Sequence, residues 1–276
     1  MNDFGQPLPL QAPLAPVLAD GQAVKIVGLG GVGSIVARYG AVLLASLAKQ
    51  QTVRLALIDG DQFEYSNTTR MLFASCGNKA AVTRADLLDH FADSRLTLLA
   101  IEEYVTADNL ARLFHPGDII IAAVDNHATR KLINDFCASQ LDDVVLISGG
   151  NDGIEKTAAG KLRRGTYGNC QVYVRQGGQD LSPCLTKYHA EIDHPADQVP
   201  TELSCTELIG SVPQLLLANL AVASAILNAL WLYLCGALHY GELVFDIADG
   251  LMRPLPIPGP HAQVARRGST GPGPSS

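Results

Sequence analysis

Short apolar runs alternate with helix-like segments through the first 150 residues of the chain. Five runs have the length and β-branched composition of buried strands: 24–29, 53–58, 96–101, 118–124 and 144–148. The segments between them predict helices over 34–49, 80–91, 107–114 and 127–139. Because the fourth run, 118–124, is continuously apolar after its first residue, this strand is expected to be buried on both faces, as in a parallel sheet. The alternation predicts a Rossmann-like, doubly wound α/β fold with a mostly parallel sheet.

The pattern changes after Gly150. Segments 156–164 and 170–175 predict antiparallel strands joined at 165–168, and 243–247 predicts a late strand, so the sheet is expected to carry a C-terminal antiparallel extension. The polar, proline-containing stretch 176–210 predicts a long loop. The domain is expected to cover 23–253, between an N-terminal extension over 1–22 and a Pro/Gly/Ser-rich, disordered tail over 254–276.

One apolar run, 215–238, contains no charged residue and is long enough to cross a bilayer. Asn219, Ser224 and Asn228 interrupt it, and its flanks offer no Lys or Arg anchor. These features favour a long core or dimer-interface helix over a membrane span. A homodimer and no membrane contact are therefore the expectation.

Composition narrows the class of protein. The 276 residues are 47% hydrophobic, enough for one large core, and the net charge of −7 without a basic run argues against a nucleic-acid partner. Segment 1–21 has no Lys or Arg and four prolines, unlike a signal peptide. The six cysteines form no CxxC pair, which indicates reduced thiols, a cytoplasmic location and no zinc site.

A glycine-rich turn joins the first predicted strand to the first helix. Gly28, Gly30, Gly31 and Gly33 allow backbone N–H groups at a helix N-terminus to approach phosphate oxygens. Asp59 ends the second strand, where a carboxylate accepts hydrogen bonds from ribose hydroxyls; the alternative is a turn-capping role. This arrangement predicts a nucleotide site but does not distinguish ATP from NAD.

Polar residues after the second and fourth strands favour a triphosphate. Asn67, Arg70 and Lys79 supply an amide and two cations, which an NAD site does not need and a departing pyrophosphate does. Asp125 follows the fourth strand at the carboxyl edge of the sheet, where ligands bind in this architecture. One carboxylate there suits magnesium that is also bound by phosphate oxygens and water.

Three segments, Val24–Arg70, Gly77–Lys79 and Val124–Asn126, resemble the adenylation domain of the ThiF/MoeB and ubiquitin-activating superfamily. The resemblance implies ATP-dependent adenylation of the C-terminal carboxylate of a small ubiquitin-like protein. It also implies that the glycine turn wraps the adenylate, that Asp59 holds the ribose and that Asp125 binds magnesium. The contacts to the phosphates would come from Asn67, Arg70 and Lys79.

The resemblance extends to a cysteine just before the long helix. Cys205 lies where many relatives carry a cysteine on a crossover loop, which implies transfer of the acyl group to a thioester or persulfide-type linkage. An ordinary loop cysteine is the alternative, and Cys184 is the second candidate. Segments 169–174 and 214–225 most resemble ThiF-type proteins of PRTRC plasmid cassettes, which implies a conjugating-enzyme-like protein as a further partner.

Two departures from the family leave other functions open. Many relatives carry two zinc-binding CxxC pairs and an N-terminal arginine, whereas the first arginine here is Arg38. A nucleotide-binding scaffold without catalysis is therefore one alternative. An NAD-dependent oxidoreductase is another, although it gives Asn67, Arg70, Lys79 and Asp125 no role.

Overall fold

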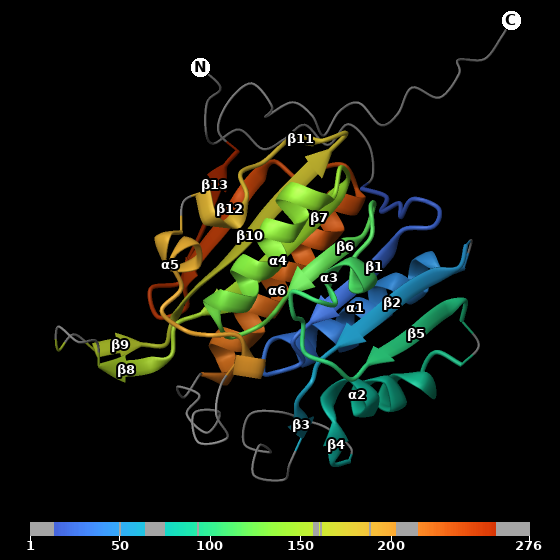
Figure 1. Cartoon of the computed structure of the whole chain (residues 1–276), viewed down its shortest axis with the longest axis horizontal. Helices are drawn as coiled ribbons and strands as arrows, with labels where there is room; N and C mark the ends of the chain where they lie inside the picture. Colours follow the sequence, from blue (N-terminus) through green and yellow to red (C-terminus); the bar gives the residue numbers. More distant parts are fainter. Residues whose placement is uncertain are drawn as a thin grey trace, which may run out of the picture.

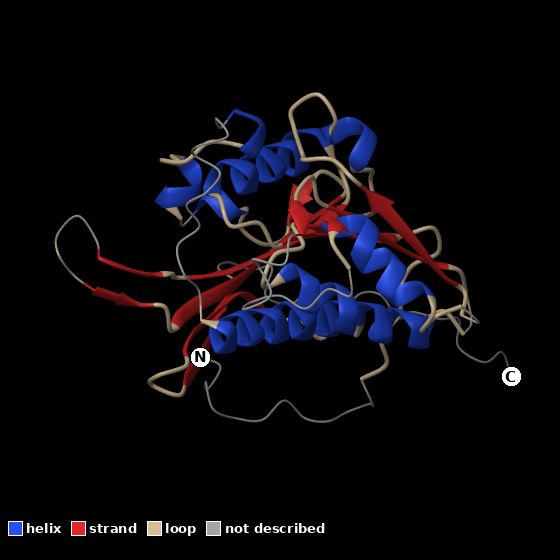
Figure 2. Ribbon diagram, turned by 90° about the horizontal axis from the view of Figure 1, so that it is seen from below, coloured by secondary structure: helices blue, strands red, loops and turns tan. Residues whose placement is uncertain are grey.

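A mixed β-sheet runs through the whole molecule, and helices cover both of its faces (Figures 1 and 2). The computed structural model describes residues 14–49, 51–63, 75–92, 94–156, 160, 162–187, 189–202 and 215–257. Within these ranges the main sheet has nine strands in the order β13-β12-β10-β7-β6-β1-β2-β5, with β11 paired to β10. The fold is the expected Rossmann-like α/β architecture.

The strands of the main sheet are β1 (Ala23–Val27), β2 (Val53–Ile58), β5 (Leu96–Ile101), β6 (Ile119–Ala122), β7 (Val144–Asn151), β10 (Tyr167–Gln176), β11 (Gln179–Asp180), β12 (Tyr240–Asp246) and β13 (Leu251–Pro256). The helices are α1 (Gly33–Leu47), α2 (Lys79–Leu88), α3 (Leu110–Leu113), α4 (His127–Gln140), α5 (Ala190–Asp193) and α6 (Leu216–Leu234). Shorter pieces are β3 (Gln62–Phe63), β4 (Gly77–Asn78), β8 (Ile154–Lys156), β9 (Leu162–Arg164), η2 (Leu185–Lys187) and η3 (Pro200–Glu202).

The five strands β5, β2, β1, β6 and β7 are parallel, as the alternation of strands and helices predicts. Every residue of β1 and β6 is buried. Helices α1, α2 and α6 contribute to one apolar core on one face, and α3, α4, α5 and η2 to a second core on the other. The carboxyl ends of the parallel strands therefore meet at one edge of the sheet.

The antiparallel extension exists, but its predicted pairing was wrong. Segment 162–164 pairs with 154–156 in a separate hairpin, while β10 pairs with β7 and β12 in the main sheet. The burial of the two strands explains this. β9 is exposed at every residue, whereas β10 contributes Cys170 and Val172 to one core and Tyr173 to the other, so only β10 fits a central position.

The expected start of the tail at Pro254 falls inside β13. This strand pairs with β12 through Pro256 and forms an edge of the sheet, where proline is tolerated because one side needs no ladder hydrogen bond. The predicted loop 176–210 contains β11, η2, α5 and η3 in its described part.

Helix α6 has the length and composition of a membrane-crossing helix, yet it packs on the sheet. It lies over β7 and β10 beside α1. A Cβ on Gly149 of β7 would come within 2.7 Å of Ile226 and 2.8 Å of Val222. The glycine thus allows the close approach of this core helix, in agreement with the expectation from its sequence.

Candidate functional site

The glycine turn joins β1 to α1 at the carboxyl edge. Gly28 has φ +83°, and a Cβ on it would lie 2.9 Å from the Ala123 carbonyl oxygen; a Cβ on Gly33 would lie 1.8 Å from the Gly28 carbonyl oxygen. The fold itself therefore requires these two glycines. A Cβ on Gly30 would meet nothing within 4 Å, and Gly30 and Gly31 are half-buried. The space beside Gly30 is open for a ligand.

Because the surroundings of Gly33 are crowded and those of Gly30 are open, alanine substitutions at the two positions form a matched pair of variants. Gly33→Ala is expected to lower the free energy of unfolding by about 3 kcal/mol or more, because overpacking against backbone cannot relax easily. Gly30→Ala is expected to leave stability within about 1 kcal/mol and to weaken nucleotide binding, because its methyl enters the ligand space. Urea unfolding and ATP titration measure the two effects. Equal loss of stability in both variants would contradict the assignment.

The carboxylate of Asp59 ties the turn to the end of β2. It is 8% exposed, and its oxygens accept hydrogen bonds from the backbone N–H groups of Leu29 (2.5 Å) and Asp61 (2.8 Å). Burial raises the pKa of Asp59, and the charge of Lys79 opposes that rise. Since Leu29 lies inside the glycine turn, the carboxylate of Asp59 holds the turn against the end of β2.

Lys79 lies beside this unit at the start of α2. Asn78 caps the helix through Ala80 N–H (2.8 Å) and donates its side-chain amide to the Asp59 carbonyl (2.8 Å), which fixes the position of Lys79. The ammonium is 2.7 Å from a carboxylate oxygen of Asp61. Burial raises the pKa of Asp61, but the Lys79 charge and hydrogen bonds from Lys79 and Tyr104 outweigh it, so the pKa lies below its usual range. To contact a phosphate, Lys79 would therefore have to give up its ion pair with the Asp61 carboxylate.

Tyr104 completes this group. Its hydroxyl donates to Asp61, and a Cβ on Gly60 would lie 2.6 Å from its ring. Tyr104 and Asp61 are 43 positions apart, and no local pattern links them. The role of Asn78, by contrast, has a local sequence signal, because asparagine just before a helix is a typical N-cap.

Asp125 lies on the neighbouring strand end, just after β6. A backbone hydrogen bond from Ala123 to Val27 (2.9 Å) holds that end against the glycine turn. Asn126 caps α4 through Thr129 N–H (2.7 Å), so Asp125 is not needed as the cap. Asp125 is exposed, and no described residue makes a hydrogen bond or ion pair with its carboxylate. It is open to a ligand.

Arg130 could not be singled out from the sequence. This residue of α4 is 7% exposed, and its guanidinium donates to the carbonyls of Val124 (2.7 Å) and Gly149 (3.0 Å) and to the Ser148 hydroxyl (3.2 Å). Burial lowers its pKa, but a guanidinium keeps its charge at neutral pH. Arg130 thereby joins the ends of β6 and β7 directly behind Asp125.

Asp197 was also missed, because it lies in the long polar segment after β10. Its two carboxylate oxygens accept hydrogen bonds from the backbone N–H groups of His127 and Ala128, both at 2.8 Å. A carboxylate at the N-terminus of α4 is favourable because of the helix dipole. This contact anchors the loop beside Asp125.

His189 lies farther along the same region, between two carboxylates. Its Nδ1 is 2.9 Å from Glu191 and its Nε2 is 3.1 Å from Glu242. The hydrogen bond to Glu242 is the largest cause that raises the pKa of His189 above its usual 6.5, and Glu191 adds to it.

A pH-dependent contribution to stability follows from His189. Because its pKa is raised on folding, its stabilising effect is complete below the unfolded value of about 6.5 and is lost as the pH rises through the folded value. His189→Gln is therefore expected to lower the melting temperature more at pH 6 than at pH 9. Thermal unfolding of both proteins at the two pH values checks this; an equal difference at both would exclude the ion pairs.

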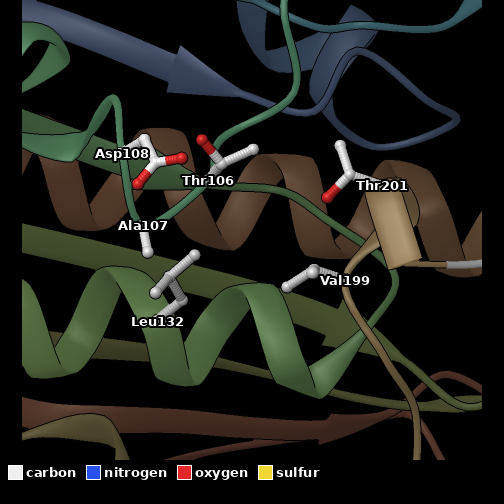
Figure 3. Close-up of a pocket in the computed structure, with 6 residues that line it drawn as sticks. All are labelled: Thr106, Ala107, Asp108, Leu132, Val199 and Thr201. Carbon is white, nitrogen blue, oxygen red and sulfur yellow. The ribbon is translucent and has the colours of Figure 1, made fainter.

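A cavity of about 400 Å³ opens between the β5–α3 connection, α4 and the segment around η3 (Figure 3). Thr106 and Asp108 line it from the connection, Leu132 from α4, and Val199 and Thr201 from the other side. None of the described candidate residues lines it. The candidate site proper is thus the open edge formed by the glycine turn, Asp59, Lys79 and Asp125.

Three predicted site residues, Asn67, Arg70 and Cys205, lie outside the described residues. In the described part, the side chains of His, Cys, Asp and Glu form no group of three that could hold a metal ion. Magnesium held by Asp125 together with phosphate oxygens and water stays a prediction.

Comparison of the sequence with known proteins identifies its family. The sequence matches the ThiF family over residues 19–239. The chain belongs to the ThiF family. This confirms the superfamily expected from the sequence; the PRTRC subfamily stays a prediction.

Among curated ThiF-related proteins, the adenylyltransferase and sulfurtransferase MOCS3 of Drosophila persimilis is 34% identical over 119 residues, 42% of this chain and 24% of the relative. MOCS3 of Anopheles gambiae is 30% identical over 118 residues, 42% of this chain and 25% of the relative. The matched region thus spans about a quarter of these relatives.

Solved structures share the ThiF fold seen here. E. coli MccB with ATP superposes with a TM-score of 0.60 at 17% identity, covering 87% of this chain and 64% of MccB. PaaA superposes with a TM-score of 0.57 at 16% identity, covering 87% of this chain and 74% of PaaA. At this identity the likeness establishes the fold.

Proposed function

We propose that this ThiF-family protein adenylates the C-terminal carboxylate of a small ubiquitin-like protein, with ATP as the nucleotide. The observation that carries the proposal is the grouping of the glycine turn, Asp59, Lys79 and Asp125 at one edge of the sheet. An NAD site accounts for the turn and Asp59 only. The adenylyltransferase relatives and the neighbour crystallised with ATP support the same reading.

Some of these residues bind the nucleotide, and others neutralise the charge of its phosphates. The turn amides and Asp59 hold the nucleotide, Lys79 and the predicted Arg70 and Asn67 neutralise phosphate charge, and Asp125 would hold magnesium. Magnesium would supply further neutralisation of the leaving pyrophosphate. The substrate carboxylate is already ionised at pH 7, so no general base is required.

Formation of an acyl-adenylate can be tested by ATP–pyrophosphate exchange. The probe is a recombinant ubiquitin-like protein ending in Gly-Gly, compared with a form whose C-terminal carboxylate is amidated. Exchange is expected with the free carboxylate alone. Exchange with neither form, under conditions where ATP binds, would favour the nucleotide-binding scaffold without catalysis.

Transfer to a thiol is a separate proposal that rests on Cys205. In the same assay, Cys205→Ala is expected to form the adenylate but no thiol-linked product. Cys184→Ala serves as the comparison because it is the second candidate. Loss of the adenylate itself in Cys205→Ala would contradict the transfer role. The conjugating-enzyme-like partner and the cytoplasmic location stay predictions.

We also propose a homodimer built on the outer faces of α1 and α6, which pack against each other. Each helix exposes large apolar side chains: Tyr39 62% and Val42 58% on α1, and Leu216 51% and Leu217 68% on α6. Where exposed apolar side chains gather, they typically mark an interface. Sedimentation equilibrium is expected to give twice the chain mass, and Leu217→Glu to shift it toward the monomer. A monomeric parent protein would exclude the interface.

A further inference from the structure

The ammonium of Lys79 is covered and neutralised by a neighbouring carboxylate. The Lys79 side chain is 10% exposed, and its ammonium donates to the Oδ2 atom of Asp61 at 2.7 Å. The Asp61 side chain is 44% exposed. An arriving phosphate would therefore meet a carboxylate that repels it and a lysine whose charge is already compensated.

The hydroxyl of Tyr104 holds the same carboxylate from its other side. It donates to the Oδ1 atom of Asp61, while Lys79 donates to Oδ2. Burial raises the pKa of Tyr104, and the hydrogen bond to Asp61 raises it further, so the hydroxyl stays protonated and donates at neutral pH. Asp61 thus keeps one strong donor if Lys79 leaves, because a hydrogen bond to a charged group is stronger than one between neutral groups.

Backbone contacts fix Asp61 and Tyr104 in place. The carbonyl of Asp61 accepts from the backbone N–H of Lys79 at 2.9 Å. Asn109 donates its side-chain amide to the carbonyl of Tyr104 at 2.9 Å, and a Cβ on Gly60 would lie 2.6 Å from the Tyr104 ring. The group that can move is therefore the Lys79 ammonium, which lies at the end of a long and flexible side chain.

We propose that Lys79 is stored on Asp61 in the nucleotide-free protein and transfers to the phosphates when ATP binds, while Tyr104 holds Asp61 in place. This transfer rests on the proposed function, because it needs a phosphate at the carboxyl edge. An ammonium that stayed paired with Asp61 would bring little net charge to a triphosphate. Asp61 and Tyr104 are then positioning residues that set the affinity for ATP through Lys79.

The variant Tyr104→Phe removes the hydroxyl and keeps the ring. Magnesium-ATP is expected to bind about fivefold more weakly, because Asp61 without this donor holds Lys79 more strongly. Adenosine carries no phosphate and should bind equally well to the variant and to the parent. Isothermal titration calorimetry of the full-length chain with the two ligands measures both affinities.

The variant Asp61→Asn should have the opposite effect. Its amide has nearly the shape of the carboxylate but does not hold the ammonium, so magnesium-ATP is expected to bind on the order of tenfold more tightly. In this background Tyr104→Phe should have no further effect, because both changes act on one interaction. Tyr104→Phe keeps every charge, so it decides the question even if Asp61→Asn does not fold.

A second tyrosine–aspartate–cation group provides the matched control. Tyr173 donates to Asp180 at 2.7 Å, and Arg175 pairs with the same carboxylate. This group lies at the opposite edge of the sheet, where Arg175 is in register with Val144, the first residue of β7. Tyr173→Phe removes an equivalent hydrogen bond and should leave the affinities for magnesium-ATP and adenosine unchanged.

The calorimetric results separate the transfer of Lys79 from the adenylation reaction. Weaker binding of magnesium-ATP by Asp61→Asn would mean that Lys79 stays on Asp61 in the complex, and would overturn the transfer. Equal losses for ATP and adenosine in Tyr104→Phe, or no loss for ATP, would also overturn it. The expected affinities without any ATP–pyrophosphate exchange would support the transfer and count against adenylation. A parent chain that binds no magnesium-ATP would overturn both proposals.

Discussion

Asp125→Asn is expected to lower the rate of ATP–pyrophosphate exchange by on the order of 10²-fold or more, because electrostatic groups at a reacting centre are worth this much. The side chain follows β6 and is exposed, and no described residue uses its carboxylate. Asparagine has nearly the same shape as aspartate but carries no charge. The folded state should therefore be unaffected, since exposed substitutions usually change stability by less than about 0.5 kcal/mol.

Asp249→Asn is the matched control, because Asp249 is an exposed carboxylate in the turn between β12 and β13. It should keep the parental exchange rate. The magnesium dependence of the rate is the sharper readout, since loss of a metal ligand should raise the magnesium concentration needed. Parental exchange in Asp125→Asn at low magnesium would remove Asp125 from the site.

Arg130→Met is expected to lower the stability of the folded protein strongly. It leaves the carbonyls of Val124 and Gly149 without their donor, and each buried unpaired group costs about 1–3 kcal/mol. A total loss of about 3 kcal/mol would lower the melting temperature by about 6–12 °C for a domain of this size. Thermal unfolding measures it directly.

Arg253→Met on β13 provides the control for this change, because Arg253 is exposed on the edge strand. Its melting temperature should match the parent. If Arg130→Met also melted with the parent, the guanidinium would not be joining β6 to β7. Another interaction would then have to hold the ends of β6 and β7 together.

The parallel half of the fold could be predicted because its signal is local. The strands predicted over 53–58 and 96–101 coincide with β2 and β5, because each is a short, mostly apolar run that alternates with helical segments. The antiparallel half depends on which strand pairs with which, and the sequence of 156–175 does not contain that information. The β8–β9 hairpin separates β7 from β10 in the chain, and β11, α5 and α6 separate β10 from β12.

The residues of the candidate site also fall into those that local sequence patterns predict and those that they do not. Glycines, Asp59, Lys79 and Asp125 could be predicted because each follows a strand or opens a helix. Tyr104, Arg130 and Asp197 could not, because their roles arise from contacts between distant segments. Asp197 reaches His127 across 70 positions, and Tyr104 reaches Asp61 across 43.

A thermal titration of the purified chain tests whether the carboxyl edge of the sheet binds magnesium-ATP, as we propose. Magnesium-ATP at about 100 times its dissociation constant should stabilise the protein by about 2.7 kcal/mol. The effect should need magnesium and should be lost in Asp125→Ala. Stabilisation by NAD, with none by magnesium-ATP, would contradict the account and assign the glycine turn to an oxidoreductase.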